Sequence, residues 1–496
     1  MISYPHLLQL ALPEVILTLT ALFLLAVDLL FLRRSTNRTR LISAALLGSI
    51  GCIAAALRLI TATEQANVLH GVFLVNPLTR IVQLAILTLT VFTLLITVDT
   101  DFTDHIAEFV ALILLATTGM MFLVATSDLL VIFIALELLS LSLYVLTAFN
   151  KHSERSAEAA LKYFLFGGMS AAFLLFGFSF LYGLSNSTNL LQISFAVHHT
   201  GLTPLVVIAI VTTLIGFGFK VAAAPFHFWA PDVYQGAPTP AAAFTASASK
   251  VASFAIFFSI MGSAFAGVAG SAEWHHLANG WVPAVAAIAA LSMVLGNVVA
   301  LAQTSVRRLL AYSAVAHAGY MLLAIASHTE QSLTALIYYV FTYGLATIGL
   351  FAIVGIIEKE IGSDKLDNFN GLSRRAPLLA LCLFIFILSL AGIPPLAGFF
   401  GKFYLFLAAI NATSGSAGLL WLVILAIAMS AVSLFYYLQV LKRAYVTPAA
   451  ENATPIKVPI VTQLVTIALA IAVLLAGCAP NLLLHWIDAA IRSTRM

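Results

Sequence analysis

The sequence predicts an all-α, polytopic membrane protein with about fourteen transmembrane helices. Of its 496 residues, 62% are hydrophobic and only 9% are charged, whereas an ordinary soluble domain carries about 25% charged residues. The mean hydropathy of +1.06 indicates helices that face lipid rather than water. The net charge of +3 comes without a basic patch, which argues against nucleic acid as a partner. The cysteines are isolated in apolar runs and favour neither a disulfide framework nor a metal or iron–sulfur site; they are Cys52, Cys382 and Cys478.

Polar and turn-rich breaks divide the chain into apolar segments of helical length. The first begins without a preceding Lys or Arg, which is not typical of a cleavable signal peptide. A short amphipathic tail, PNLLLHWIDAAIRSTRM, follows the last segment. The fourteen predicted segments are 7–32, 41–61, 76–98, 107–125, 127–149, 158–183, 204–229, 239–262, 281–302, 306–326, 332–357, 377–409, 418–446 and 457–479.

The distribution of Lys and Arg predicts the orientation in the membrane. Connections that follow even-numbered segments carry no basic residue, apart from Arg58 and Arg80 near segment ends. By the positive-inside rule, the connections after odd-numbered segments are cytoplasmic and both termini are external. Those odd connections carry fifteen basic residues: Arg33, Arg34, Arg38, Arg40, Lys151, Arg155, Arg307, Arg308, Lys359, Lys365, Arg374, Arg375, Lys442, Arg443 and Lys457.

Five charged residues fall inside hydrophobic segments, away from these connections. They are Glu137, Lys162, Lys220, Lys250 and Lys402. A charge at the bilayer centre costs about 2.5–3.5 kcal/mol on insertion scales, so a purely structural bundle is not expected to keep five of them. Two further acids lie in the first segment and have no role that the sequence assigns; they are Glu14 and Asp28.

Prolines interrupt two of the lysine-bearing segments. Pro225 follows Lys220 in GFGFKVAAAPFHFW, and Pro394–Pro395 precede Lys402 in LAGIPPLAGFFGKF. A proline inside a helix removes a donor and clashes with the preceding turn, so we expect a broken helix at both places. If segments four to eight and nine to thirteen are two five-helix units, the broken helix is the fourth of each.

Because five is odd, the second unit enters the membrane from the opposite side, which predicts an inverted repeat. The predicted divisions are an N-terminal three-helix part (1–98), a first five-helix unit (107–262), a second unit (281–446), and a last helix with its tail (457–496).

Buried lysines beside helix breaks are suited to moving protons. Burial favours the neutral amine and a nearby carboxylate favours the ammonium, so a lysine whose surroundings change can take up and release a proton. Broken helices admit water at mid-depth. More ordinary interpretations remain open: Lys162 as a snorkelling side chain, Glu137 as a structural acid, and His227 and His317 as core histidines rather than proton relays. The many Phe and Tyr residues are interpreted as lipid-facing and interfacial, and no phosphate loop or metal-spaced histidine cluster is present in the sequence.

Three motifs resemble the antiporter-like membrane subunits of respiratory complex I, a family related to Mrp-type cation/proton antiporter subunits. They are PDVYQGAPTPAAAF (231–244), ELLSLSLYVL (137–146) and LAGIPPLAGFFGKFYLF (390–406), and the resemblance spans essentially the whole chain. The loop and the twelfth segment are most similar to the subunit N branch. Gln235 stands where a glutamate is expected, and because it lies in the loop this puts little in doubt.

The resemblance implies a role for each buried charge. Glu137 and Lys220 form the coupling ion pair, Lys162 modulates Lys220, Lys250 bridges the two units, and Lys402 lies in the outer half of the proton path. The chain itself is expected to hold no flavin, iron–sulfur cluster, nicotinamide or metal. These cofactors belong to a peripheral NADH-oxidising arm, the partners include further membrane subunits, and quinone is reduced at a distant interface. The implied location is the bacterial inner membrane.

Three functional hypotheses follow. The first is a proton-translocating subunit of NADH:quinone oxidoreductase, an enzyme whose redox chemistry takes place outside this chain. The second is an Mrp-type antiporter subunit without redox partners. The third is a passive scaffold, which predicts that neutralising the buried lysines leaves activity intact.

Overall fold

The computed structural model describes residues 4–274, 276–412, 418–449 and 454–494, and helices account for most of them. Strands in this part of the chain form two short antiparallel hairpins, β1 (Ala66–Val68) with β2 (Phe73–Val75) and β3 (Ser271–Glu273) with β4 (His276–Ala278). The predicted all-α, polytopic class is confirmed.

Twelve helices among the described residues are long and apolar enough to cross a membrane. The other two predicted segments are the interrupted ones: α9 (Pro204–Lys220), followed by a break, and the pair α17 (Pro377–Ala391) and α18 (Ala397–Ile410). The twelve spans are α2 with a π-helical end (Leu12–Leu32), α3 (Asn37–Thr61), α4 (Pro77–Thr97), α5 (Ile106–Val124), α6 (Leu129–Thr147), α7 (Glu154–Ser185), α11 with α12 (Thr239–Ser263), α13 (Trp281–Leu301), α14 (Val306–Ser327), α15 (Glu330–Ile361), α19 (Leu420–Tyr445) and α20 (Ile460–Cys478).

Shorter helices occupy the ends and connections. The amphipathic tail forms α21, and its exposed side carries Leu482 and Trp486 while Ile487 and Ile491 are buried. The short helices are α1 (Tyr4–Leu10), α8 (Leu190–Thr200), α10 (Trp229–Gly236), α16 (Leu372–Arg375) and α21 (Pro480–Thr494).

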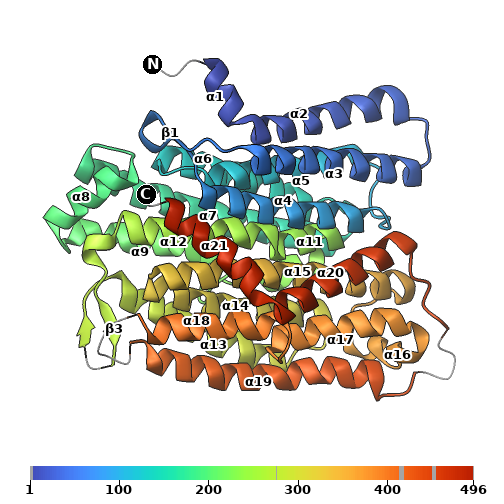
Figure 1. The fold of residues 1–496 in the computed structure, drawn as a ribbon. Coiled ribbons are helices and arrows are strands. Elements are labelled where there is room, and N and C mark those ends of the chain that lie inside the picture. The colour runs from blue at the N-terminus through green and yellow to red at the C-terminus, as the bar shows by residue number, and fades with distance from the viewer. Residues whose placement is uncertain (1–3, 275, 413–417, 450–453, 495–496) are drawn as a thin grey trace. The chain divides into compact units, whose positions relative to one another are not determined.

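The chain forms two compact units. One contains Met1–Phe217, Gly236–Ala269 and Ile487–Met496; the other contains Gly218–Gln235 and Gly270–Trp486. In the first unit α2, α3 and α4 lie in succession, with α5 packed against all three (Figure 1). The predicted boundaries 107–262 and 281–446 describe a repeat rather than compact bodies, and they remain a prediction.

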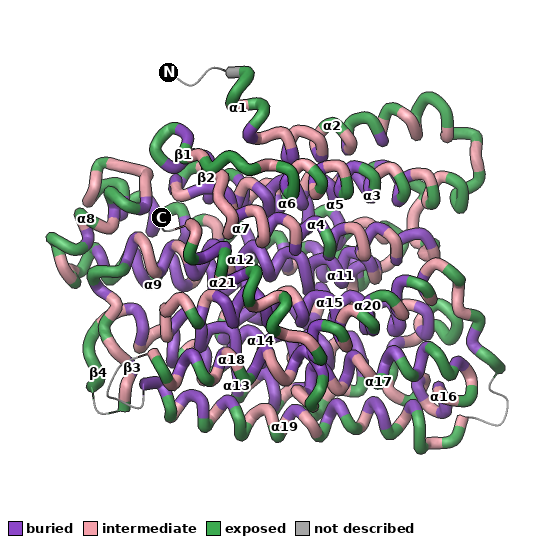
Figure 2. Tube along the Cα trace, in the orientation of Figure 1, coloured by how far each residue is buried: buried purple, intermediate pink, exposed green. Residues whose placement is uncertain are grey.

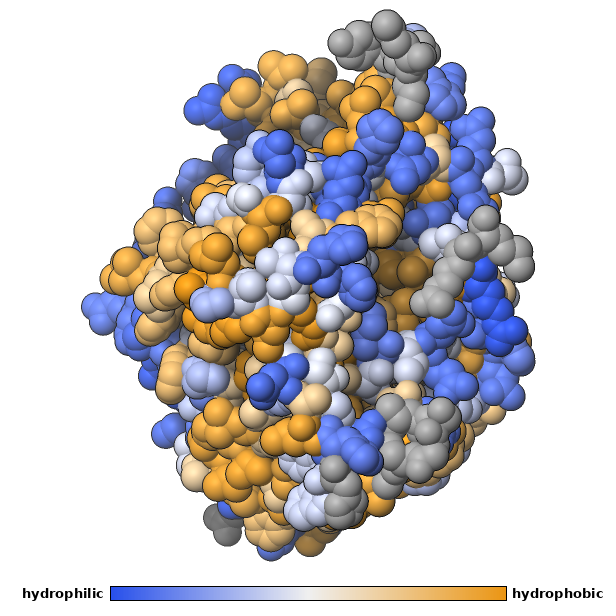
Figure 3. Space-filling model, turned by 90° about the vertical axis from the view of Figure 1, so that its left-hand side faces the viewer, coloured by the Kyte–Doolittle hydropathy of each residue, from blue (hydrophilic) through white to orange (hydrophobic). Residues whose placement is uncertain are grey.

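In the second unit, α14 and α15 are buried along nearly their whole length (Figure 2). α13 packs closely on α14, because a Cβ on Gly296 would lie 2.5 Å from the backbone nitrogen of Ala316 and a Cβ on Gly319 2.8 Å from the carbonyl oxygen of Ala289. Small residues at such crossings let helix backbones approach in the membrane. By contrast, most residues of α2 and α19 are not buried within the protein, as in lipid-facing helices. The face drawn in Figure 3 has hydrophilic residues among the hydrophobic ones.

Hydrogen bonds between connections show which of them share a side of the membrane. Among odd connections, Asn37 Nδ2 donates to Asp104 (2.7 Å) and the guanidinium of Arg375 to the carbonyl of Thr454 (3.1 Å). On the even side, the indole of Trp421 in the first turn of α19 donates to the carbonyl of Ala272 in the connection before α13 (2.8 Å). These contacts agree with the predicted alternation of odd and even connections, while the absolute orientation rests on the positive-inside rule.

A local motif recurs in the two units. The residues around the N-cap Asp128 of α6 pair with those around Asn189, and the Thr188 hydroxyl donates to the Asp128 carboxylate. The residues around the N-cap Ser305 of α14 pair in the same way with those around Lys365. There the Ser305 hydroxyl donates to the Asp364 carboxylate. The N-cap residue supplies the hydroxyl in this pairing and the carboxylate in the first one. The first pairing lies on the predicted external side and the second on the cytoplasmic side, which supports an inverted repeat.

Reporter fusions test the orientation. A reporter inserted in the connection 359–375 is expected to be cytoplasmic, and one inserted at 184–203 external, because basic residues hold odd connections inside. Alkaline phosphatase and fluorescent-protein activities measured on the same pair of sites give opposite signals for the two sides. The reverse pattern would contradict the topology and, with it, the direction of the repeat.

Candidate functional site

Lys402 lies on α18 with its side chain folded back onto the end of α17. It is 4% exposed, and its Nζ donates to the carbonyls of Leu390 (3.0 Å) and Ala391 (3.1 Å) and to the Ser430 hydroxyl (2.8 Å). The helix break at Gly392 (φ 86°) leaves those carbonyls without helical donors. Three acceptors match the three N–H groups of an ammonium, and the C-terminal end of a helix favours a cation.

A chain of buried polar side chains continues from Lys402. Its Nζ lies 5.0 Å from the centre of the Tyr320 ring, a cation–π contact. The Tyr320 hydroxyl accepts from Asn297 Nδ2 (3.2 Å), and Tyr436 donates to Asn297 Oδ1 (3.0 Å). α13, α14, α18 and α19 each contribute to this chain, so it depends on the close crossing of α13 and α14.

His317 lies on α14 within the same unit and has both ring nitrogens hydrogen-bonded. Nδ1 lies 2.6 Å from the Tyr339 hydroxyl and Nε2 lies 3.0 Å from the Tyr437 hydroxyl, which in turn lies 2.5 Å from Ser313 Oγ. His317 is 2% exposed. An imidazole held between two hydroxyls can accept a proton on one nitrogen and lose one from the other.

These residues correct one interpretation of the sequence. Tyrosine was expected at interfaces and lipid-facing surfaces, but the tyrosines of this cluster are among the most buried side chains. A buried tyrosine requires a partner for its hydroxyl. Here Asn297 is the partner of Tyr320 and Tyr436, and His317 is the partner of Tyr339 and Tyr437. The available signals were Asn297 inside an apolar run and the paired tyrosines in YY motifs. The residues that sequence reasoning missed are Asn297, Tyr320, Tyr339, Ser430, Tyr436 and Tyr437.

The first break follows α9 directly. Lys220 is the last residue of that helix and is half-buried. Ala222 then takes a positive φ of 59°, and the Trp229 indole donates to the carbonyl of Phe219 (2.9 Å). His227 is buried, stacks on Phe228, and its Nδ1 has no hydrogen-bond partner among the residues that the structure describes. The break predicted at Pro225 is therefore present.

Lys250 lies beside a third break that the sequence analysis did not identify. Ser247, with φ −120° and ψ −83°, separates α11 from α12, and Lys250 follows within the first turn of α12 with 1% exposure. The hydroxyls of Thr245, Ser247 and Ser249 each bond the carbonyl four residues earlier. Such bonds compete with the helical ladder and often bend helices. The run TASAS before Lys250 was the available signal.

Glu137 and Lys162 lie on α6 and α7. Glu137 is half-buried near the middle of α6. Lys162 Nζ lies 2.5 Å from the Glu158 carboxylate one turn earlier on α7, and the two side chains are 39% and 64% exposed. An exposed pair of this kind contributes about 0.3–0.5 kcal/mol. Pairing with Glu158 is compatible with a snorkelling lysine, and the roles of Glu137 and Lys162 in proton transfer stay predictions.

The short helix α10, where the sequence predicted a loop, is held by two arginines at the start of α14. Arg308 Nη1 donates to Asp232 (2.8 Å) and to the side-chain oxygen of Gln235 (3.4 Å). Arg307 is buried, pairs with Glu358 and contacts the carbonyl of Gln235 (3.5 Å). The amide at position 235 therefore serves as an acceptor where a glutamate was expected. Sequence reasoning counted both arginines only as orientation signals.

The structure also assigns the two unexplained acids of the first segment. The Asp28 carboxylate receives two hydrogen bonds from the Arg40 guanidinium (2.8 and 2.5 Å). Glu14 is buried and accepts from Gln83 Nε2 (2.7 Å). Both acids therefore have structural partners within the first unit. Among the described residues, His, Cys, Asp and Glu form no group of three that is suited to hold a metal ion.

Interrupted apolar helices with buried lysines at the interruptions define an ion-translocating class of membrane protein. The sequence profile of the NADH:quinone oxidoreductase/Mrp antiporter transmembrane family matches residues 125–432. NADH-quinone oxidoreductase subunit N 2 of Acidobacterium capsulatum is 53% identical over 98% of this chain and 99% of its own length. The chain belongs to this family, in its subunit N branch.

Solved structures agree with this family. A chain of respiratory complex I from Thermus thermophilus with bound aureothin is 34% identical, covers 96% of this chain and 100% of its own, and superposes with a TM-score of 0.79. A chain of the Mrp complex from Dietzia sp. DQ12-45-1b has a TM-score of 0.81 at 20% identity, covering 98% of this chain and 97% of its own. That second likeness shows the shared fold alone.

Replacing Asn297 tests the buried polar chain. Asn297→Leu keeps a similar volume but removes the acceptor of the Tyr436 hydroxyl and a donor to Tyr320. A buried group left unpaired costs about 1–3 kcal/mol, so thermal unfolding in detergent is expected at a lower temperature. The double variant Asn297→Leu/Tyr436→Phe removes one unpaired hydroxyl and is expected to recover part of the loss. Unchanged stability of Asn297→Leu would contradict the network.

Proposed function

We propose that this chain is the proton-translocating membrane subunit of an NADH:quinone oxidoreductase. Protons would cross through its buried lysines while partner subunits pass electrons from NADH to quinone. One observation carries the proposal: each of Lys220, Lys250 and Lys402 lies at a main-chain interruption of its transmembrane segment. An interruption exposes backbone polar groups in a region where lipid offers none, and so gives water and protons a path.

Lys402 provides the clearest chemical step. As an ammonium it uses three donors on two carbonyls and a hydroxyl. When Nζ gives one proton to the next acceptor along the path, its lone pair becomes an acceptor. The Ser430 hydroxyl can then turn and donate to it, since a hydroxyl both donates and accepts. The surroundings therefore accommodate both protonation states without an unpaired group.

The two histidines have surroundings that suit proton relays. His317 already lies between two tyrosine hydroxyls. The unpartnered Nδ1 of His227 is buried next to the first break, where a polar atom without a partner is costly and a water molecule would satisfy it. Both histidines are therefore proposed as relays rather than as purely structural residues.

The assembly follows from the family. We propose that this chain assembles with further membrane subunits and with a peripheral arm that contains the flavin and the iron–sulfur clusters, while quinone is reduced at a distant interface. The location would be the bacterial inner membrane, with both termini external. The Mrp alternative is less supported, because the likeness to that complex is one of fold while the 53% identical relative is a subunit N. Purification of the native complex separates the two hypotheses, since only the first predicts that flavin and iron–sulfur proteins co-purify with this chain.

The ion pair between Glu137 and Lys220 remains a prediction with a direct test. Lys220→Ala and Glu137→Ala are each expected to lower pumping and quinone reduction together, because removing one partner leaves the other charge uncompensated, at about 3–5 kcal/mol. The double variant is expected to assemble at least as well as either single one. Proton uptake and quinone reduction measured in sealed vesicles provide the comparison. Full activity of both single variants would exclude the pair as the coupling element.

Lys402→Arg separates a proton carrier from a fixed charge. Arginine keeps a cation near the α17 carbonyls but does not release its proton. Assembly is therefore expected to persist while turnover and proton release fall, and Lys402→Ala is expected to lose more pumping. Lys457→Arg, the same exchange at an exposed lysine, is the control. Wild-type pumping by Lys402→Arg would make Lys402 an electrostatic fixture.

A further inference from the structure

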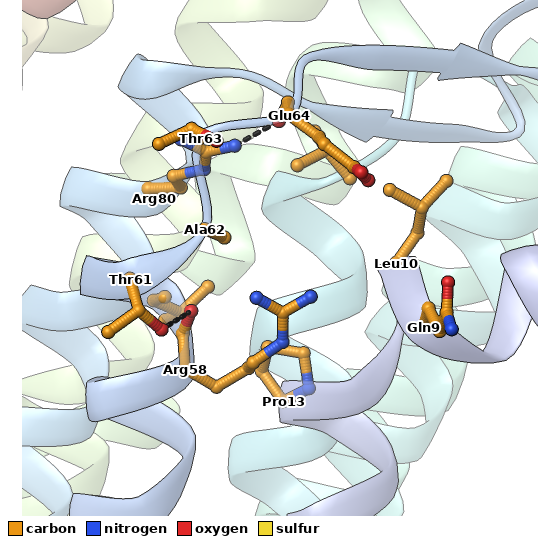
Figure 4. Close-up of a pocket in the computed structure, with 11 residues that line it drawn as sticks. Gln9, Leu10, Pro13, Arg58, Thr61, Ala62, Thr63, Glu64 and Arg80 are labelled. Carbon is orange, nitrogen blue, oxygen red and sulfur yellow. Dashed lines mark hydrogen bonds between the residues drawn. The ribbon is translucent and has the colours of Figure 1, made fainter.

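Two arginines break the charge pattern that orients this chain, and the fold brings them to one cavity. Arg58 lies in the last turn of α3 and Arg80 in the first turn of α4, and they are the basic residues near even connections that otherwise carry no Lys or Arg. Both line a cavity of about 120 Å³ in the first unit (Figure 4). This volume is several times the roughly 10–15 Å³ that one water molecule needs.

Arg80 lies at an electrostatically unfavourable position, which a nearby anion would offset. The first turn of a helix has a partial positive charge that repels a cation. One Nη of Arg80 donates to the carbonyl of Glu64, and its Nε is buried without a hydrogen-bond partner among the described residues. An orphaned guanidinium nitrogen beside a cavity is a donor that lacks an acceptor.

Arg58 supplies the second guanidinium. In Figure 4 its side chain extends from α3 into the space between Arg80, Glu64 and Pro13. In the part of the chain that the structure describes, neither arginine forms an ion pair with a carboxylate. Two arginines and the Glu64 carboxylate leave the cavity with a formal charge of +1. A guanidinium fork matches phosphate oxygens in geometry as well as in charge.

The surroundings of the cavity point to lipid. Leu10, Pro13 and Leu59 give it an apolar wall. Along α3, Leu57 and Ile60 next to Arg58 are 58% and 66% exposed, as expected for side chains that face acyl chains. A ligand that places an anion between the arginines and hydrocarbon along α3 satisfies both the charge and the apolar surface.

We propose that this cavity binds the phosphodiester headgroup of an anionic phospholipid with a single negative charge. Arg58 and Arg80 hold the phosphate, and Glu64 limits the site to a monoanion. The two exceptions to the charge pattern then have a binding role rather than an orienting one. The inference does not depend on the proposed proton chemistry, nor on which face of the membrane carries the cavity.

The test uses the purified membrane complex that contains this chain, delipidated and titrated with phosphatidylglycerol or phosphatidylcholine. Native mass spectrometry counts bound lipid, and thermal unfolding reports stabilisation. Arg58→Gln and Arg80→Gln are each expected to weaken phosphatidylglycerol binding by roughly tenfold, the typical effect of one charge-assisted hydrogen bond. Arg38→Gln, at the other end of α3 and exposed, is the control and should bind as wild type.

Glu64→Gln provides a test of opposite sign that does not require the arginine variants to assemble. Removing this carboxylate raises the charge of the cavity, so phosphatidylglycerol should bind severalfold more tightly. Unchanged or weaker binding would overturn the proposal, as would arginine variants that retain phosphatidylglycerol like wild type.

Two other outcomes also contradict it. If inorganic phosphate at millimolar concentration stabilises the complex as phosphatidylglycerol does, with the same dependence on both arginines, the site takes a free anion. If the arginine variants lose a partner subunit but keep their lipid, the occupant is a protein carboxylate.

Discussion

In lipid, a backbone carbonyl must accept a hydrogen bond from within the protein because no water is available. This requirement determines which side chains lie at the broken helices. At the end of α17, Lys402 supplies the missing donors to Leu390 and Ala391. At the end of α9, the indole of Trp229 supplies one to Phe219. A structural requirement thus places a titratable amine in the membrane interior at one break, while a group that never titrates fills the comparable position at the other.

The two breaks also share a backbone pattern that the sequence conceals. Ala222 and Gly392 have positive φ values of 59° and 86°, and each is followed three residues later by a proline, Pro225 or Pro395. Positive φ is common for glycine and uncommon for alanine, so the sequence predicts a turn at Gly392 but not at Ala222. The two interruptions therefore share a backbone turn although the residue at that turn differs.

Sequence reasoning found what depends on hydrophobicity and on proline, and missed what depends on packing. Segment count, the breaks at Pro225 and Pro394–Pro395, and the burial of Lys250 and Lys402 all follow from local composition. The break at Ser247 does not, because hydroxyl bonds to the preceding turn cause it rather than a proline. The tyrosines around His317 were misplaced since a tyrosine at an interface and one in a polar core have the same local sequence. Only the packing of α14 against α15 and α19 distinguishes them.

The corresponding positions beyond the two breaks carry opposite charges. Asp232 follows Pro225 by seven residues, and Lys402 follows Pro395 by seven. Asp232 is partly exposed and paired with Arg308, which fixes α10 to α14, whereas Lys402 is buried and bonded to neutral acceptors. An ionic partner favours the charged form of a group and so opposes proton exchange. An ammonium held only by carbonyls and a hydroxyl can lose its proton without leaving an unpaired countercharge. The same place in the repeat therefore anchors α10 in one half and carries the proposed proton-transfer group in the other.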